Sequence, residues 1–88
     1  MNVQFKESFI KDLRAIRDSS LRARIKEIIE AVEQARRLED IANLKKLTGG
    51  SHYYRIRVGD YRIGLTIEGE VVTFVRFLHR RDIYKRFP

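Results

Sequence analysis

The sequence predicts a small α+β domain in which an N-terminal strand and a helical hairpin pack on an antiparallel sheet of three to four strands. Three observations lead to this fold class. Apolar and polar side chains alternate with a period of two in residues 54–58 and again in 61–67, as in half-buried strands. Residues 9–16 and 21–35 carry apolar side chains at helical spacing. The run at 71–78 is almost continuously apolar, which is typical of a strand covered on both faces.

The first elements along the chain are a short strand and two helices. Residues 2–6 alternate Val3 and Phe5 with polar neighbours, which favours a strand. Two apolar helical faces follow, formed by Phe9, Leu13 and Ile16 and then by Leu21, Ile25, Ile28, Ile29, Val32 and Ala35. Between these faces, residues 18–20 (DSS) supply side-chain oxygens that can cap the second helix.

The stretch between the helices and the sheet admits two interpretations. Its apolar residues, Ile41, Leu44 and Leu47, stand at helical spacing, so residues 38–47 form either a short third helix or an ordered loop. The only Gly/Ser cluster of the chain, TGGS at 48–51, predicts a turn into the sheet. It is too short for a domain linker, so we expect a single domain over residues 1–88.

The centre of the predicted sheet is a β-hairpin whose two-residue loop is Gly59-Asp60. This loop sets Arg57 opposite Arg62 and Arg55 opposite Gly64 on one face. Like charges directly opposite each other cost a few tenths to about 1 kcal/mol. Three converging guanidinium groups therefore suggest a bound polyanion, with open space for it above the glycine. The alternative is a solvated face whose arginines serve solubility.

The second turn, at residues 68–70, leaves the next register undecided because its loop can hold two or three residues. With a two-residue loop, Phe77 and His79 join the arginines. With a three-residue loop, Arg76 joins them instead.

Positive charge is concentrated in the second half of the chain. The formal net charge is +7. Residues 1–44 hold nine Lys and Arg against eight Asp and Glu, whereas residues 45–88 hold ten against four. This excess indicates an acidic partner, most simply nucleic acid. The basic tail at 79–88 also carries Tyr84, and an aromatic ring among cations suits base stacking, worth roughly 1 to 3 kcal/mol per base.

Composition excludes several other classes. There is no cysteine, so disulfides and thiolate metal sites are excluded. Two isolated histidines without clustered carboxylates make a poor ligand set, and we expect neither a metal nor a cofactor. No apolar run is long enough to span a bilayer, and residues 1–6 lack the apolar core of a signal peptide. We therefore expect a cytoplasmic protein that does not bind membranes.

Three segments carry a family resemblance: LTG at 47–49, YRIRVGDYR at 54–62 and HRRDIY at 79–84. With the order strand, helix, helix and three strands, they resemble the RelE/ParE toxin superfamily of prokaryotic toxin-antitoxin systems over nearly the whole chain. The RelE branch implies a ribosome-dependent endoribonuclease that cuts messenger RNA in the decoding site. It also implies neutralisation by a cognate antitoxin, with a heterotetramer as one assembly.

The resemblance and the basic pattern together assign the candidate residues. Carried over position by position, the family's functional residues fall on Arg55, Arg57, Arg62, Arg80 and Tyr84. We predict a catalytic group of Arg57, Arg62, Arg80, Tyr84 and His79. We predict an RNA-binding group of Lys45, Lys46, Arg55, Arg81 and Lys85.

One departure from the family bears on proton transfer. Attack of a ribose 2′-hydroxyl on the neighbouring phosphate needs a proton acceptor, a proton donor and positive charge. Where relatives have lysines, this chain has Arg55 and Arg57, and arginine is effectively never deprotonated. His79, Tyr84 and His52 remain for proton transfer, and we expect His52 to be a strand-edge histidine.

Two other functions remain open. The ParE branch shares the fold and is taken to poison DNA gyrase without cutting RNA. A basic nucleic-acid-binding module without catalysis is the third candidate. The joint presence of Arg57, Arg62, Arg80 and Tyr84 favours the nuclease.

Overall fold

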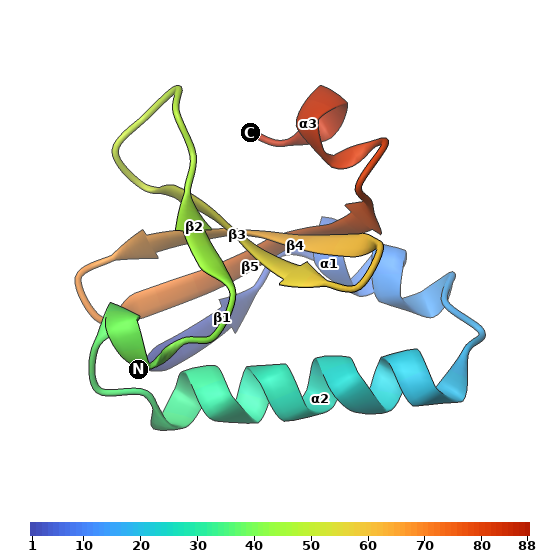
Figure 1. The fold of residues 1–88 in the computed structure, drawn as a ribbon, viewed down its shortest axis with the longest axis horizontal. Helices are drawn as coiled ribbons and strands as arrows, with labels where there is room; N and C mark the ends of the chain where they lie inside the picture. Colours follow the sequence, from blue (N-terminus) through green and yellow to red (C-terminus); the bar gives the residue numbers. More distant parts are fainter.

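The computed structural model describes residues 1–88 as one mixed sheet with helices on both of its faces (Figure 1). The elements are β1 (Asn2–Phe5), α1 (Glu7–Arg14), α2 (Ser19–Gln34), the 3₁₀ turn η1 (Leu38–Asp40), β2 (Leu44–Lys46), β3 (Tyr53–Val58), β4 (Tyr61–Glu68), β5 (Val71–His79) and α3 (Ile83–Arg86). The strand order is β1-β5-β4-β3-β2. Strand β1 runs parallel to β5, and the other pairs are antiparallel.

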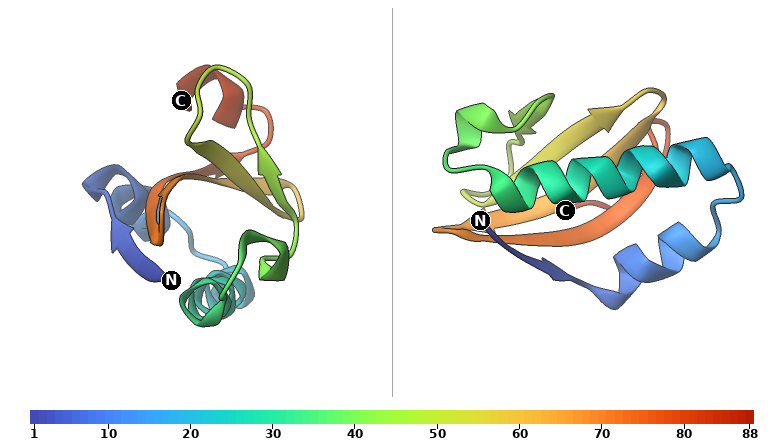
Figure 2. Two further views of the ribbon diagram at one scale, coloured as in Figure 1. Left: turned by 90° about the vertical axis from the view of Figure 1, so that its left-hand side faces the viewer. Right: turned by 90° about the horizontal axis from the view of Figure 1, so that it is seen from below.

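The two faces of the sheet have different covers. Helix α2 lies across one face, while the C-terminal helix α3 lies on the opposite side (Figures 1 and 2). The main hydrophobic core forms between α1, α2 and the sheet, and its largest members are Phe9, Phe74, Phe77, Ile25, Ile56, Ile63 and Leu65. No helix is long and apolar enough to cross a membrane.

The predicted α+β fold is confirmed, with its N-terminal strand, its helical hairpin and four antiparallel strands, β2 to β5; β1 brings the sheet to five strands in all. Strand β1 joins one edge by pairing with β5. The stretch at 38–47 is neither a continuous helix nor a loop, because Leu44–Lys46 forms an edge strand after the short turn η1. Asn43, with a φ of 62°, turns the chain so that Leu44 pairs with Ile56 at the margin of the core.

The loop between β4 and β5 holds two residues, since Glu68 pairs with Val71. The predicted consequence of that loop is nevertheless wrong. A bulge shifts the register so that Leu65 pairs with Phe74 but Gly64 pairs with Arg76. Phe77 and His79 are thereby moved off the arginine side of the sheet, and Arg76 is moved onto it. A bulge cannot be read from loop length, which is why neither predicted register matches.

Helix α1 covers the part of the β5 edge that β1 is too short to pair. The Ser8 hydroxyl donates to the Val75 carbonyl at 2.6 Å. The Asp12 carboxylate accepts from the Phe77 amide at 2.8 Å and from two nitrogens of Arg76, at 2.8 and 3.1 Å. Side chains of α1 therefore satisfy backbone groups around the bulge that would otherwise be unpaired.

The predicted cap of the second helix is confirmed. Asp18 Oδ1 accepts hydrogen bonds from the Ser20 amide at 2.9 Å, the Ser20 hydroxyl at 2.7 Å and the Leu21 amide at 3.2 Å. Hydrogen bonds hold the pKa of Asp18 below its ordinary value. The bond from the Ser20 hydroxyl has the largest effect, and the bond from the Leu21 amide has the next largest. The carboxylate is therefore the form that stabilises the start of α2.

This cap predicts a small pH dependence of stability. A carboxyl whose folded-state pKa is lowered stabilises the fold above its unfolded-state pKa and loses that contribution as the pH falls through the folded value. We expect Asp18→Ala to lower the urea midpoint at pH 7. Asp18→Asn keeps an acceptor but cannot titrate, so its difference from the wild type should shrink below about pH 4. A constant difference between pH 7 and pH 3 would contradict this role.

Candidate nucleic-acid interface

The face of the sheet opposite α2 is here called the arginine face. It carries the predicted cations in two cross-strand rows, one through Arg55 and one through Arg57 and Arg62. The predicted hairpin register is confirmed: Arg57 pairs with Arg62, and Arg55 pairs with Gly64. Strand β2 extends the Arg55 row, because Lys45 is the partner of Arg55. Lys46 pairs with Tyr54 and so belongs to the opposite face, away from the other predicted RNA-binding residues. The arginine face therefore unites most of the predicted sheet cations but not all of them.

The three hairpin arginines differ in how many hydrogen bonds their guanidinium groups already make. Arg55 donates through Nη1 to the Asn43 carbonyl at 2.9 Å, and its Nε is buried without a partner. Arg62 donates through Nη1 to the carbonyls of Gly59 and Tyr61, at 2.8 and 2.9 Å. These bonds hold the Arg62 guanidinium at the hairpin loop. Arg57 is exposed and its side chain has no hydrogen bond or ion pair, so it is the guanidinium most available to an anion.

The expectation of open space above Gly64 is wrong. A Cβ placed on Gly64 would lie 2.7 Å from two ring atoms of Phe87. The Phe87 side chain is almost completely buried and meets the Tyr53 ring edge-on, with centroids 5.6 Å apart. The C-terminal segment thus covers the middle of the arginine face. The predicted anion site is therefore limited to the part of the face beside this segment, towards the hairpin loop.

The chain after β5 is tied to that same loop. The Arg80 amide donates to the Asp60 carbonyl at 2.8 Å, and Arg80 Nε lies 3.9 Å from Asp60 Oδ1. Arg80 is therefore held at the hairpin end of the sheet, where Arg57 and Arg62 lie. The Tyr84 side chain, on α3, is 58% exposed and available to a ligand.

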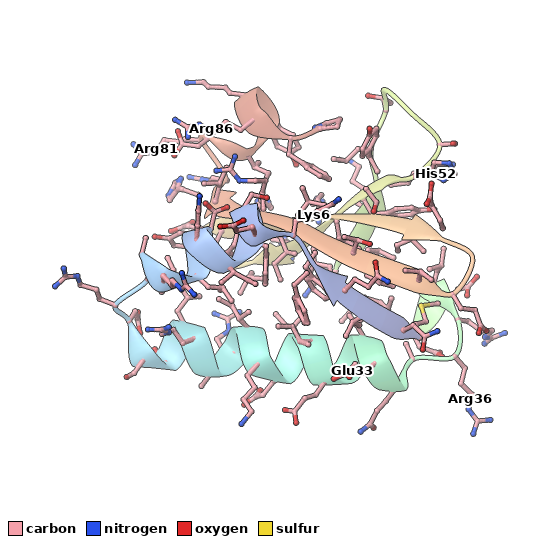
Figure 3. The ribbon with its side chains drawn as sticks, turned by 180° about the vertical axis from the view of Figure 1, so that it is seen from behind. Lys6, Glu33, Arg36, His52, Arg81 and Arg86 are labelled. Carbon is pink, nitrogen blue, oxygen red and sulfur yellow. The ribbon has the colours of Figure 1, made fainter.

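The basic residues of the tail gather at one end of the molecule. Arg86, the last residue of α3, and Arg81 lie near each other, while His52 lies at the other end of the molecule (Figure 3). His52 Nε2 is 3.4 Å from Glu68 Oε1, and both side chains are exposed. Of the two histidines, only His79 is therefore near the predicted catalytic arginines.

His79 is poorly arranged to accept a proton. Its Nδ1 already accepts a hydrogen bond from the Arg81 amide at 3.2 Å, so the neutral ring carries its proton on Nε2. The ring packs edge-on against Tyr61 at 5.5 Å and shares that residue's register, away from the arginine face. Protonation at Nδ1 would break the bond that shapes the chain after β5.

One cation near the loop carried no signal in the sequence. Arg24 reaches from α2 to the hairpin, and its Nη1 lies 3.7 Å from the position that a Cβ would take on Gly59. Nothing in its position in the sequence links Arg24 to the hairpin. Its proximity to the hairpin loop depends on the packing of α2 under the sheet.

Neither a metal centre nor a deep cavity marks the arginine face. No group of three or more His, Cys, Asp or Glu side chains is placed to hold a metal ion. The larger hollow, about 380 Å³, lies along α2, where Leu13, Ile25 and Ile29 line it together with the charged side chains of Arg22, Lys26, Glu30 and Glu33. It is on the other side of the sheet from Arg57 and Arg62. The arginine face is therefore an open surface that carries cationic side chains.

Comparisons with known proteins cover nearly the whole chain. A family model described as the ParE toxin of the type II toxin-antitoxin system matches residues 3–84. Toxin RelE3 of Methanocaldococcus jannaschii is 45% identical over 89 residues, which span 100% of both chains. A chain in the crystal structure of the RelB-RelE antitoxin-toxin complex from Methanococcus jannaschii is 43% identical, with a TM-score of 0.80 over 97% of this chain and 99% of that chain. A chain of the intact E. coli RelBE complex is 26% identical, with a TM-score of 0.66 over 89% and 94% of the two chains.

Proposed function

Because the chain belongs to the RelE/ParE toxin family of type II toxin-antitoxin systems, we propose that it cuts messenger RNA on the ribosome and so inhibits translation. The observation that carries this proposal is the cross-strand pair Arg57 and Arg62, which concentrates positive charge on an open face. The RelE branch is favoured by the 45% identity to Toxin RelE3 over the full chain. A gyrase-directed activity, as implied by the ParE branch, is the competing outcome.

The proposed reaction is an internal transesterification. The ribose 2′-oxygen attacks the adjacent phosphorus, the bond to the 5′-oxygen breaks, and a 2′,3′-cyclic phosphate and a 5′-hydroxyl result. Arg57 and Arg62 would stabilise the extra negative charge on the phosphoryl oxygens in the transition state. Arg62 is suited to this because two carbonyl groups already orient its guanidinium. Arg80 would add charge from the end of β5.

Tyr84 is the best candidate for a proton donor. Its side chain is 58% exposed on α3 and carries an O–H group that can donate a proton. Tyr84 would donate to the leaving 5′-oxygen or stack its ring on a base. The proton acceptor for the 2′-hydroxyl would come from the ribosome or the message, since Arg55 and Arg57 cannot serve.

The proposed partners follow from charge and from the relatives. A cognate antitoxin with an acidic segment would neutralise the toxin by covering Arg57 and Arg62 or by displacing the C-terminal segment. The similar RelE chain from Methanococcus jannaschii was solved in complex with RelB, which supports a heteromeric assembly with an antitoxin. A heterotetramer is one such assembly. Lys45, Arg55, Arg81 and Lys85 would contact RNA, and the site of action would be the cytoplasm.

The proposal is tested in a translating extract. We expect added protein to generate new messenger RNA 5′ ends inside codons, only when ribosomes are translating. Tyr84→Phe should lower the single-turnover cleavage rate on programmed ribosomes by about a hundredfold or more, while His79→Gln should change it much less. Ribosome binding should be nearly unchanged in both variants. Intact messages together with a supercoiling defect would replace the nuclease with a gyrase inhibitor.

A further inference from the structure

The C-terminal segment is attached to the arginine face at two apolar points. Ile83 is fully buried and the Phe87 side chain is only 3% exposed. Neither residue belongs to the main hydrophobic core, which lies on the other side of the sheet. They form a second apolar contact on the face where α3 lies (Figure 1).

The Phe87 contact depends on a residue without a side chain. Gly64 does not have a positive φ, so its backbone conformation is one that any residue adopts. A larger residue does not fit here because its Cβ would lie 2.7 Å from the Phe87 ring. Gly64 is the partner of Arg55 and stands two residues after Arg62 on the same face. The ring therefore lies on the same face as Arg62, two residues along β4 from this arginine, which is proposed to stabilise the phosphoryl charge.

Helix α3 cannot orient itself. It spans Ile83–Arg86 only, far below the length at which a helix is stable in water. Ile83 and Phe87 are four residues apart, and the Phe87 amide donates to the Ile83 carbonyl at 2.8 Å, so both anchors point to one side of the turn. Tyr84 follows the first anchor by one residue and projects away from this side, in agreement with its exposure. The position of the Tyr84 ring is thus set by where the two anchors bind.

We propose that Phe87, seated on Gly64 against Tyr53, is a positioning residue that holds α3, and with it Tyr84, on the arginine face for cleavage. This inference rests on the proposed nuclease function. A purely structural role would make Phe87 matter for stability alone, with no effect on the rate per folded molecule. If Phe87 instead positions Tyr84, the cleavage rate depends on where the Phe87 ring binds. Displacement of a catalytic group by about 1 Å can lower the rate a hundredfold.

The test combines two substitutions that disturb the same contact from opposite sides. Phe87→Ala removes the ring, and Gly64→Ala places a methyl group where the ring packs on the glycine. We expect each to lower the single-turnover rate at saturating ribosomes by about 10- to 100-fold, with little change in the half-saturating ribosome concentration. The double variant should be no slower than Phe87→Ala, because the seat is irrelevant once the ring is gone. Phe5→Ala, the same change at the β1 edge, should keep the wild-type rate at temperatures where it stays folded.

Seating of the ring is measured independently by the ring-current shift of the Gly64 α-protons, which Phe87→Ala should abolish. A wild type with that shift but without cleavage would overturn the nuclease function and the positioning role together, while leaving the contact itself established. A wild type that cleaves, with Phe87→Ala cleaving equally fast, would overturn positioning alone. A double variant much slower than either single one would also overturn it, because the two residues would then act separately.

Discussion

Replacing both Arg57 and Arg62 with alanine is expected to lower the ribosome-dependent cleavage rate by about 10²- to 10³-fold and to abolish growth inhibition. The two guanidinium groups are direct cross-strand neighbours, and Arg57 has no partner of its own. Fixed positive charge at this position stabilises a phosphorane-like transition state more than the bound message. The loss should therefore appear in the single-turnover rate at saturating ribosomes.

The same double substitution should leave stability nearly unchanged, which separates function from folding. Removing the facing charges relieves about 0.2 to 1 kcal/mol of repulsion, while the loss of the Arg62 bonds to two loop carbonyls acts in the other direction. A matched control removes two charges elsewhere through Lys26→Ala with Arg36→Ala, both outside the arginine face. If the control weakens cleavage as much as Arg57→Ala with Arg62→Ala, general attraction to RNA explains the effect and the local anion site does not exist.

The hairpin could be predicted in full because its determinants are local. A two-residue loop at Gly59-Asp60 leaves one register for the flanking strands, so the pairing of Arg57 with Arg62 follows without knowledge of the rest of the fold. The determinants of the start of α2 are also local, since the Asp18 side chain accepts hydrogen bonds from amides within three residues of itself. Short-range geometry of this kind was sufficient to find the centre of the candidate site.

The parts that could not be predicted depend on contacts between distant segments. Leu44 becomes part of a strand only because Ile56 is available to pair with it. The bulge at Val75 depends on side chains of α1 that bind its backbone, and those side chains lie over sixty residues earlier. Gly64 is covered by Phe87. The sequence did not indicate this contact because Phe87 lies in a tail of mostly basic residues. The spacing of Ile83 and Phe87 by four residues was the one available signal for this anchor.

Asp12→Ala is expected to lower the free energy of unfolding by about 3 kcal/mol. The Asp12 and Arg76 side chains are only 13% and 21% exposed, so this ion pair is largely shielded from water. Its removal leaves both the Arg76 guanidinium and the Phe77 amide without their partner. In a domain of this size the melting temperature should fall by roughly 12 to 24 °C. Glu7→Ala on the same helix removes an exposed pair with Lys11 and should cost less than about 1 kcal/mol.

A double-mutant cycle separates the two parts of the Asp12 effect. Arg76→Met in the Asp12→Ala background removes the shielded charge but leaves the Phe77 amide unpaired, so we expect it to restore part of the lost stability. Asp12→Asn retains one acceptor oxygen and should fall between the wild type and Asp12→Ala. Chemical denaturation of the wild type, Asp12→Ala, Arg76→Met and the double variant gives the coupling energy directly. A coupling energy near zero would mean that α1 is held to β5 by its apolar contacts, such as Phe9 against Phe74, and that the ion pair only accompanies them.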